Sequence, residues 1–253
     1  MFLPIYTLWR RELTRFFRQP SRIAGAVATP LLFWLFMGSG LSGSFRLPGG
    51  PEAFSYLEYF FPGTIVLVLL FAAIFSNISV IEDRHEGFLQ GVLVAPVSRT
   101  ALVAGKILGG ATLAWLQGVI FLILAPFSGI HLTAASLLEA AGVLALLAIT
   151  LTALGFFFAW KLDSVQGFHA IMNVVLLPMW LLSGAFFPLS GAPRWLSTLM
   201  RVNPLTYGVE LLRQELSGQA AAPGTAVSIG VTLALGLLCL VGSLLATRGA
   251  RVD

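Results

Sequence analysis

Apolar runs of membrane-crossing length alternate with short polar segments along most of the chain. Each of six runs approaches or exceeds the roughly 20 residues that cross a hydrocarbon core of about 30 Å. Because backbone polar groups in lipid must bond within their own segment, such runs are predicted to be helices. The predicted spans are 23–41, 61–81, 101–124, 137–160, 167–182 and 226–246. The pattern predicts an all-α integral membrane protein with one transmembrane domain over residues 1–253.

The segment before the first span, 1–20, places apolar and basic positions on opposite sides of a helical wheel. The residues that mark the two sides are Trp9, Arg10, Arg11 and Phe16. Glu12 alone intrudes among the apolar positions. Such a helix is predicted to lie in the membrane interface with its basic face toward anionic headgroups. A simple positively charged anchor and a mechanical role both remain open.

A charged segment, 82–99, separates the second span from the third. Its apolar stripe of about two helical turns consists of Phe88, Leu89, Val92 and Leu93. Pro96 ends the helical pattern. A short amphipathic helix held between two spans can dock in a groove of a soluble partner; resting on the headgroups is the alternative. In the next span, Gly109 and Gly110 are predicted to allow close helix approach.

A proline-punctuated segment, 184–215, separates the fifth span from the sixth. Pro193 lies early in one predicted helix. Asn203 and Pro204 break the chain before a second helix, which Thr206 is predicted to cap. Irregular backbone at membrane depth is tolerated only where protein or water satisfies it. The segment is therefore predicted to be a re-entrant helix pair that lines or covers a cavity, with a packing hairpin as the alternative.

Composition and charge fit this arrangement and orient it. The chain is 57% hydrophobic and 10% charged, with a mean hydropathy of +0.90, whereas soluble domains carry about a quarter charged residues. Six spans put both termini on one side, and eleven of the fifteen Lys and Arg residues fall on that side. The remaining four are Arg46, Arg194, Arg201 and Arg213. The excess predicts cytoplasmic termini in an inner (plasma) membrane, so that 82–99 faces the cytoplasm and 184–215 faces outward.

The motifs of common enzymes are missing from the sequence. It contains no G-x-x-x-x-G-K-[ST] phosphate loop and no G-x-S-x-G, and His85 is followed by Glu86 without the second histidine of H-E-x-x-H. No catalytic residue, metal or bound cofactor is predicted for this chain. The predicted spans hold at most one carboxylate, Glu139, whereas proton-driven carriers usually use several. Any energy for transport is expected to come from another chain.

The sequence resembles the membrane subunits of type-2 ABC exporters over nearly its whole length. The matching stretches are the basic amphipathic N-terminal helix, YFFPGTIVLVLLFAAIFSN, EDRHEGFLQGVLVAPVSRTALVAGK and SGAFFPLSGAPRWLSTLMRVNPLTYGVELLR. The last stretch matches a family pattern through Ser183, Gly184, Pro188, Pro193, Trp195, Leu196, Asn203, Pro204, Leu205, Thr206, Glu210 and Arg213.

The resemblance implies a homodimer or heterodimer of six-span subunits with two separately encoded cytoplasmic ATPase subunits, which bind ATP and Mg. No nucleic-acid partner is expected, whereas membrane lipid is. By analogy, 82–99 is a coupling segment and 184–215 an exit lid. The residues assigned to coupling are Glu86, Gly87, Phe88, Leu89, Leu93, Pro96 and Arg99. Those assigned to the lid are Pro188, Pro193, Trp195, Asn203, Pro204, Thr206, Glu210 and Arg213.

The family exports drugs, lipid-linked glycans, teichoic acids, lipo-oligosaccharides or ions. Aromatic faces suit sugar rings and flat apolar drugs, which favours an amphiphilic substrate over an ion. The aromatic residues considered are Phe156, Phe157, Phe158, Trp160, Trp180, Phe186 and Phe187; helix packing or lipid contact is their alternative role. A secondary transporter and a non-transporting scaffold for a soluble partner are the alternative functions.

Overall fold

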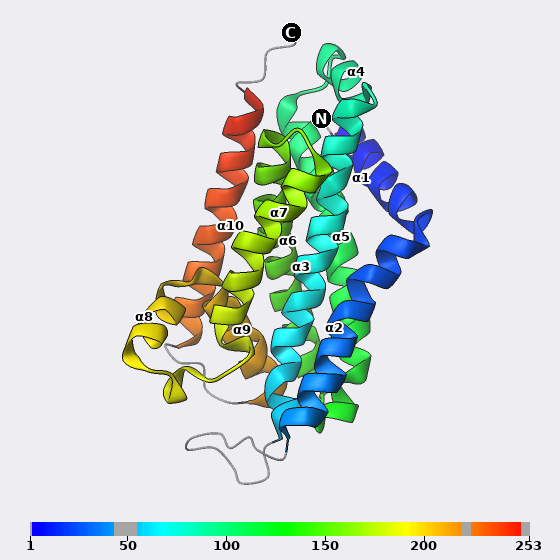
Figure 1. The fold of residues 1–253 in the computed structure, drawn as a ribbon. Helices are drawn as coiled ribbons and strands as arrows, with labels where there is room; N and C mark the ends of the chain where they lie inside the picture. The colour runs from blue at the N-terminus through cyan, green and yellow to red at the C-terminus, as the bar shows by residue number, and fades with distance from the viewer. Residues whose placement is uncertain (1, 43–54, 219–223, 249–253) are drawn as a thin grey trace.

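Every regular element in the described residues of this computed structural model, 2–42, 55–218 and 224–248, is a helix (Figure 1). Six are long and apolar enough to cross a membrane: α2 (Pro20–Leu41), α3 (Tyr56–His85), α5 (Arg99–Phe121), α6 (Ala134–Lys161), α7 (Val165–Trp180) and α10 (Thr225–Arg248). The shorter helices are α1 (Phe2–Phe17), α4 (Phe88–Val94), α8 (Arg194–Val202) and α9 (Pro204–Ser217). Two segments are 3₁₀ helices, η1 (Leu122–Ser128) and η3 (Leu189–Gly191), and η2 (Leu181–Ala185) is a wider π-helical turn. The prediction of an all-α, six-span protein is confirmed.

The second span begins earlier and ends later than predicted. Pro62, near the predicted start, lies inside α3, which begins at Tyr56 because the Ser55 side chain accepts a hydrogen bond from the backbone of Glu58. At 30 residues, α3 is about 45 Å long, which exceeds the hydrocarbon thickness. Its two ends therefore extend past the membrane core, and one of them carries the charged residues that follow Ile81.

α3 is the central helix of the fold. Of its most apolar window, 89% is buried within the protein, compared with 22% for α2 and for α10. It packs against α2, α5, α6 and α7, which surround it in the bundle (Figure 1). The outer helices α2 and α10 expose apolar side chains, which suits contact with lipid.

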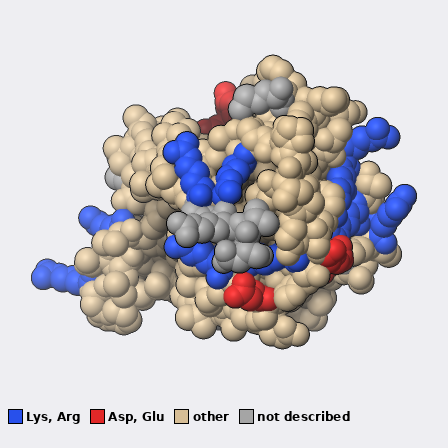
Figure 2. Space-filling view, turned by 90° about the horizontal axis from the view of Figure 1, so that it is seen from above, with Lys and Arg blue, Asp and Glu red and all other residues tan. Residues whose placement is uncertain are grey.

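Charged and amphipathic elements separate to the two ends of the bundle. α1, α4 and the end of α10 lie at one end, here called the α4 end, and α8 lies near the other, the α8 end (Figure 1). Figure 2 looks onto the α4 end, where blue Lys and Arg side chains dominate over red carboxylates. Arg46 and Arg251, which entered the charge count, lie outside the described residues.

α1 does not lie on the membrane alone but packs along α5, where glycines bring the two helices close. A Cβ atom added at Gly105 would come within 2.7 Å of the Leu8 Cβ atom, and one at Gly109 within 2.7 Å of the Glu12 Cβ atom. Gly110 faces the opposite way, toward Ser76 of α3. The expectation of close helix approach at this pair of glycines is confirmed.

Gly109→Ala is expected to destabilise the protein even though alanine is the better helix former. Relieving the contact with Glu12 must shift α1, at a cost of about 1–3 kcal/mol, which exceeds the roughly 1 kcal/mol gained in helix propensity. Gly142→Ala in α6 is the matched control, because nothing lies within 4 Å of the added Cβ atom. The midpoint temperature of thermal unfolding in detergent should fall for Gly109→Ala and should stay the same or rise for Gly142→Ala. Equal shifts would contradict the packing described here.

Candidate functional site

Charged side chains of α1, α3 and α5 meet in a buried cluster at the α4 end, here called the ionic joint. Its members are Arg11, Glu12, Arg15, Ser79, Asp83 and Lys106. Glu12, Asp83 and Lys106 are only 5%, 0% and 5% exposed. The Lys106 ammonium donates to the Glu12 carboxylate at 2.6 Å and also to Asp83. A buried charge of this kind is tolerated only when it is paired and hydrogen-bonded.

Each buried carboxylate of the ionic joint has several donors. The Arg11 guanidinium donates to both oxygens of Asp83, at 2.8 and 2.7 Å, and Arg15 donates to the same carboxylate at 2.6 Å. The Ser79 hydroxyl donates to Glu12 at 2.6 Å. Burial works against the charge on Arg11, but its hydrogen bonds to Asp83 and the negative charges of Asp83, Glu12 and Glu86 together outweigh burial and raise the pKa of Arg11. The charges are therefore held as ion pairs.

The same arginines reach the connection between α3 and α4, here called the elbow, which runs from Glu82 to Phe88. Arg15 donates to Glu82 at 2.9 Å and to Glu86 at 3.4 Å. The Arg11 guanidinium lies 3.7 Å from the centre of the Phe88 ring, a cation–π contact. α1 thus holds both the end of α3 and the start of α4.

Further contacts connect the coupling segment to other helix ends. Arg84 donates to the backbone oxygen of Leu162 at 3.1 Å and to the Asp163 carboxylate at 2.9 Å, just past α6. Arg99, assigned to coupling, begins α5 and donates to the backbone oxygen of Thr247 in the last turn of α10. Movement of α4 would therefore act on α1, α6 and α10 together.

The apolar stripe of α4 faces the protein itself rather than outward. Gly87 precedes the helix with φ of +77°, a conformation that suits glycine, and turns the chain back over the bundle. Leu89 is buried, while Phe88, Val92 and Leu93 pack against the core. The outward side of the helix presents Gln90, Gly91 and the 72% exposed side chain of Val94, and Pro96 after it is also exposed.

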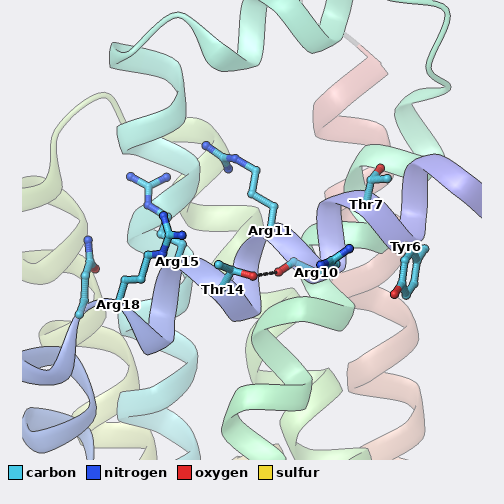
Figure 3. Close-up of a pocket in the computed structure, with 8 residues that line it drawn as sticks. Tyr6, Thr7, Arg10, Arg11, Thr14, Arg15 and Arg18 are labelled. Carbon is cyan, nitrogen blue, oxygen red and sulfur yellow. Dashed lines mark hydrogen bonds between the residues drawn. The ribbon is translucent and has the colours of Figure 1, made fainter.

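Residues predicted for the interfacial helix divide between the two sides of α1. The Trp9 indole donates to the Thr112 hydroxyl of α5 at 3.0 Å, and Phe16 is buried. Arg11 belongs to the ionic joint, whereas Arg10 is exposed and lines an open hollow along the helix (Figure 3). α1 is accordingly both docked on the bundle and basic on its free side.

A second constellation surrounds the end of α7, where the helix changes to the wide turn η2; it is here called the α7 break and covers 179–186. Gly184 has φ of +77°, which interrupts the helical hydrogen-bond pattern and releases backbone carbonyls. Asn203 donates to the carbonyl of Met179 at 2.6 Å and Arg213 to that of Gly184 at 2.7 Å. Side chains at the start of α9 and within it thus bond the carbonyl groups that the interrupted helix leaves free.

Two tyrosines of α3 donate further hydrogen bonds to the carbonyl groups of the α7 break. The Tyr59 hydroxyl donates to the Gly184 carbonyl at 2.6 Å, and the Tyr56 hydroxyl donates to the Phe186 carbonyl at 2.8 Å. The Arg213 guanidinium also pairs with Glu210 and lies 4.3 Å from the centre of the Tyr59 ring. Burial raises the pKa of Glu210, and Arg213 opposes that shift.

The structure assigns the predicted lid residues different positions. Asn203 caps α9 by accepting from the backbone of Leu205 at 3.1 Å. The expectation that Thr206 caps this helix is wrong; its hydroxyl donates to the Met200 carbonyl at 2.6 Å and to Leu182, because the preceding Asn203 already fills the cap position. Pro193 precedes α8 directly rather than lying inside it.

Not every predicted lid residue takes part in the α7 break. Pro188 precedes η3 and Pro204 is the first residue of α9, so both prolines mark where a helical turn begins. Trp195 is 67% exposed and, with Leu199 and Val202, turns an apolar side of α8 away from the protein. That side is suited to contact with lipid.

Several residues of the two constellations were missed by sequence reasoning. Glu12 gave a usable signal, because it alone broke the apolar arc of α1. Neither Asp83 nor Lys106 stands out in the sequence, since charges near span ends are common. Tyr56 and Tyr59 have no distinguishing pattern in the sequence, and only the fold brings them to the α7 break.

Three of the seven aromatic residues considered for contact with a substrate are buried and pack within the protein. Phe156, Trp160 and Trp180 are buried within this chain; Phe156 stacks on Trp160, and Trp180 donates to the Gly63 carbonyl at 2.7 Å. Their alternative role, helix packing, describes these three. In the part of the chain that the structure describes, no group of three or more His, Cys, Asp or Glu side chains could hold a metal ion.

The family model described as ABC-2 type transporter matches residues 4–216. The chain is 30% identical over 213 residues to the ycf38 protein of Cyanophora paradoxa, provisionally named a transport permease, with 83% of this chain and 72% of that protein covered. It is 27% identical over 236 residues to nodulation protein J of Rhizobium leguminosarum bv. viciae, covering 92% and 87%. It is also 27% identical over 229 residues to the inner membrane transport permease YadH of Escherichia coli, covering 86% and 84%.

Proposed function

This chain belongs to the ABC-2 type transporter family of membrane permeases, and we propose that it is the permease subunit of an ATP-driven exporter. A separate ABC ATPase supplies the energy, because the sequence contains no phosphate-binding loop of its own. Two permease subunits and two ATPase subunits form the complete transporter, with both permease termini and α4 in the cytoplasm. The permease is neither an enzyme nor a holder of ATP or Mg.

The observation that supports this proposal best is the connection of α4 to the ionic joint. A seven-residue helix projecting from a membrane bundle would bend under load if it were attached only by its two ends. Here Arg15 bonds the elbow to α1, and Arg99 bonds the start of α5 to α10. A push on the exposed side of α4 is therefore transmitted to several helices at once.

The α7 break supports a role for α8 and α9 at the exit. Backbone that leaves regular helix at membrane depth needs protein partners, and Asn203, Arg213 and Tyr59 supply them. The two short helices then form a stable outward cover instead of a loose loop. Rearrangement of this cover releases the cargo when α7 and α9 separate.

We propose an amphiphilic cargo such as a drug, a lipid or a lipid-linked glycan. After the buried rings are set aside, Phe157, Phe158, Phe186 and Phe187 remain partly exposed. Such faces favour ring-containing or apolar groups over a bare ion. Loading from the cytoplasm or the inner leaflet suits a cargo that already partitions into lipid.

Val94→Arg is expected to uncouple the permease from its ATPase. The side chain is 72% exposed, so the substitution leaves the fold intact but places a charge in the proposed contact. Disruption of a central contact residue costs about 1–3 kcal/mol, which weakens ATPase association by about 5- to 150-fold. The measurement is co-purification of the ATPase with the tagged permease, followed by ATP-driven uptake of fluorescent amphiphiles into inside-out vesicles.

Val202→Arg is the matched control, since Val202 is 75% exposed and lies on α8 at the other end. It should retain the ATPase at the level of the unchanged protein. Transport by this chain alone under an ion gradient would instead indicate a secondary carrier. ATPase binding without any cargo-stimulated hydrolysis would indicate a scaffold, and either result would refute the exporter.

A further inference from the structure

An open hollow of about 670 Å³ runs along the free side of α1. Arginine side chains extend into it from two neighbouring rows of the helix (Figure 3). One row, spaced four residues apart, contains Tyr6, Arg10, Thr14 and Arg18; the other contains Arg11 and Arg15. Four guanidinium groups on two turns and a half of helix form the densest positive charge on any single helix described.

The two rows differ in how their charge is used. Arg11 and Arg15 are held by Asp83 and by the carboxylates of the elbow. Arg10 and Arg18 are exposed and have no carboxylate partner among the residues that the structure describes. The outer row therefore carries positive charge that the fold itself does not neutralise.

The surroundings of the outer row indicate what neutralises it. Phe2, Leu3 and Phe17 on the same helix are exposed, and an amphipathic helix with exposed apolar and basic side chains is stabilised at a lipid interface. Two turns of helix, about 12 Å, separate Arg10 from Arg18. That spacing suits two neighbouring headgroups, one for each arginine.

We propose that Arg10 and Arg18 are a binding site for anionic phospholipid, each arginine holding one headgroup phosphate. The inference rests on the proposed position of α1 in the membrane interface. Arginine suits this role because its planar fork donates two hydrogen bonds to phosphate oxygens. The acyl chains lie beside the exposed apolar residues of α1. Since the inner row is bound to the elbow, occupied lipid sites hold α1, and with it the base of α4, at a fixed depth.

The test is a titration of the purified full-length permease with phosphatidylglycerol, followed by native mass spectrometry. An arginine near an anionic surface contributes about 1 kcal/mol, so Arg10→Gln with Arg18→Gln should weaken lipid affinity by about 30-fold. The matched control replaces the exposed arginines of α8, Arg194 and Arg201, with glutamine. It should change the affinity by less than about threefold, as expected of charges outside the site.

Three results would overturn the site. The first is equal weakening by both double variants, which would reduce the effect to general charge. The second is displacement of bound lipid by excess inorganic phosphate at constant ionic strength, which would identify a free-anion site. The third is unchanged lipid affinity of the Arg10→Gln, Arg18→Gln variant in the titration, together with loss of ATPase co-purification in a separate experiment, which would assign the row to a protein contact. Because the titration contains no ATPase and no cargo, its outcome is independent of the exporter proposal.

Discussion

Lys106→Met is expected to lower the free energy of unfolding by about 3–5 kcal/mol, the range measured when one partner of a buried ion pair is removed. Methionine matches the length of lysine but leaves the Glu12 carboxylate buried without its main cation, with only the Ser79 hydroxyl and a 3.3 Å contact to Arg11 remaining. Asp83 keeps two arginines and loses less. Equilibrium unfolding in mixed micelles measures the change.

The chain offers a direct control, because its only other lysine is Lys161, which is exposed and contacts the Phe157 ring. Lys161→Met should change stability by no more than about 0.5–1 kcal/mol. Adding Glu12→Gln to Lys106→Met should recover part of the loss, since residues in one network couple by about 0.5–3 kcal/mol. Wild-type stability for Lys106→Met would show that the ionic joint does not bind α1 to the bundle.

Arg213→Met is expected to cost about 3 kcal/mol and to loosen the end of α7. The substitution removes a donor from the Gly184 carbonyl and leaves the partly buried Glu210 without its arginine partner. The Tyr59 hydroxyl still reaches that carbonyl, which keeps the loss below that of a fully orphaned group. Hydrogen–deuterium exchange should rise in η2 and in the first turns of α9 before the rest of the bundle opens.

Arg201→Met, at an exposed site on α8, serves as the control for Arg213 and should leave both stability and exchange nearly unchanged. Arg213→Lys should recover the charge pair but not both bonds of the guanidinium, and so should fall between the two methionine variants. Uniform exchange across the whole bundle would contradict a local role for Arg213 at the α7 break.

The two amphipathic surface helices illustrate the limits of pattern reasoning. α1 was expected as an interfacial helix, and its basic side fits that expectation. Its apolar side, however, packs on Gly105 and Gly109 of α5, and no periodicity distinguishes a side that contacts lipid from one that contacts a neighbouring helix. The stripe of α4 was assigned to a partner for the same reason and instead packs against the protein itself.

What the sequence determined by itself is local: six spans, the short helix after the second of them and the broken pair before the last. Run length, proline and glycine decide these features within a few residues of chain. Only tertiary structure decided that Glu12, Asp83 and Lys106 share one site, and that Asn203, Arg213 and Tyr59 satisfy one helix end. Those groups lie far apart in the chain, and the burial that makes their pairing obligatory does not exist until the helices pack.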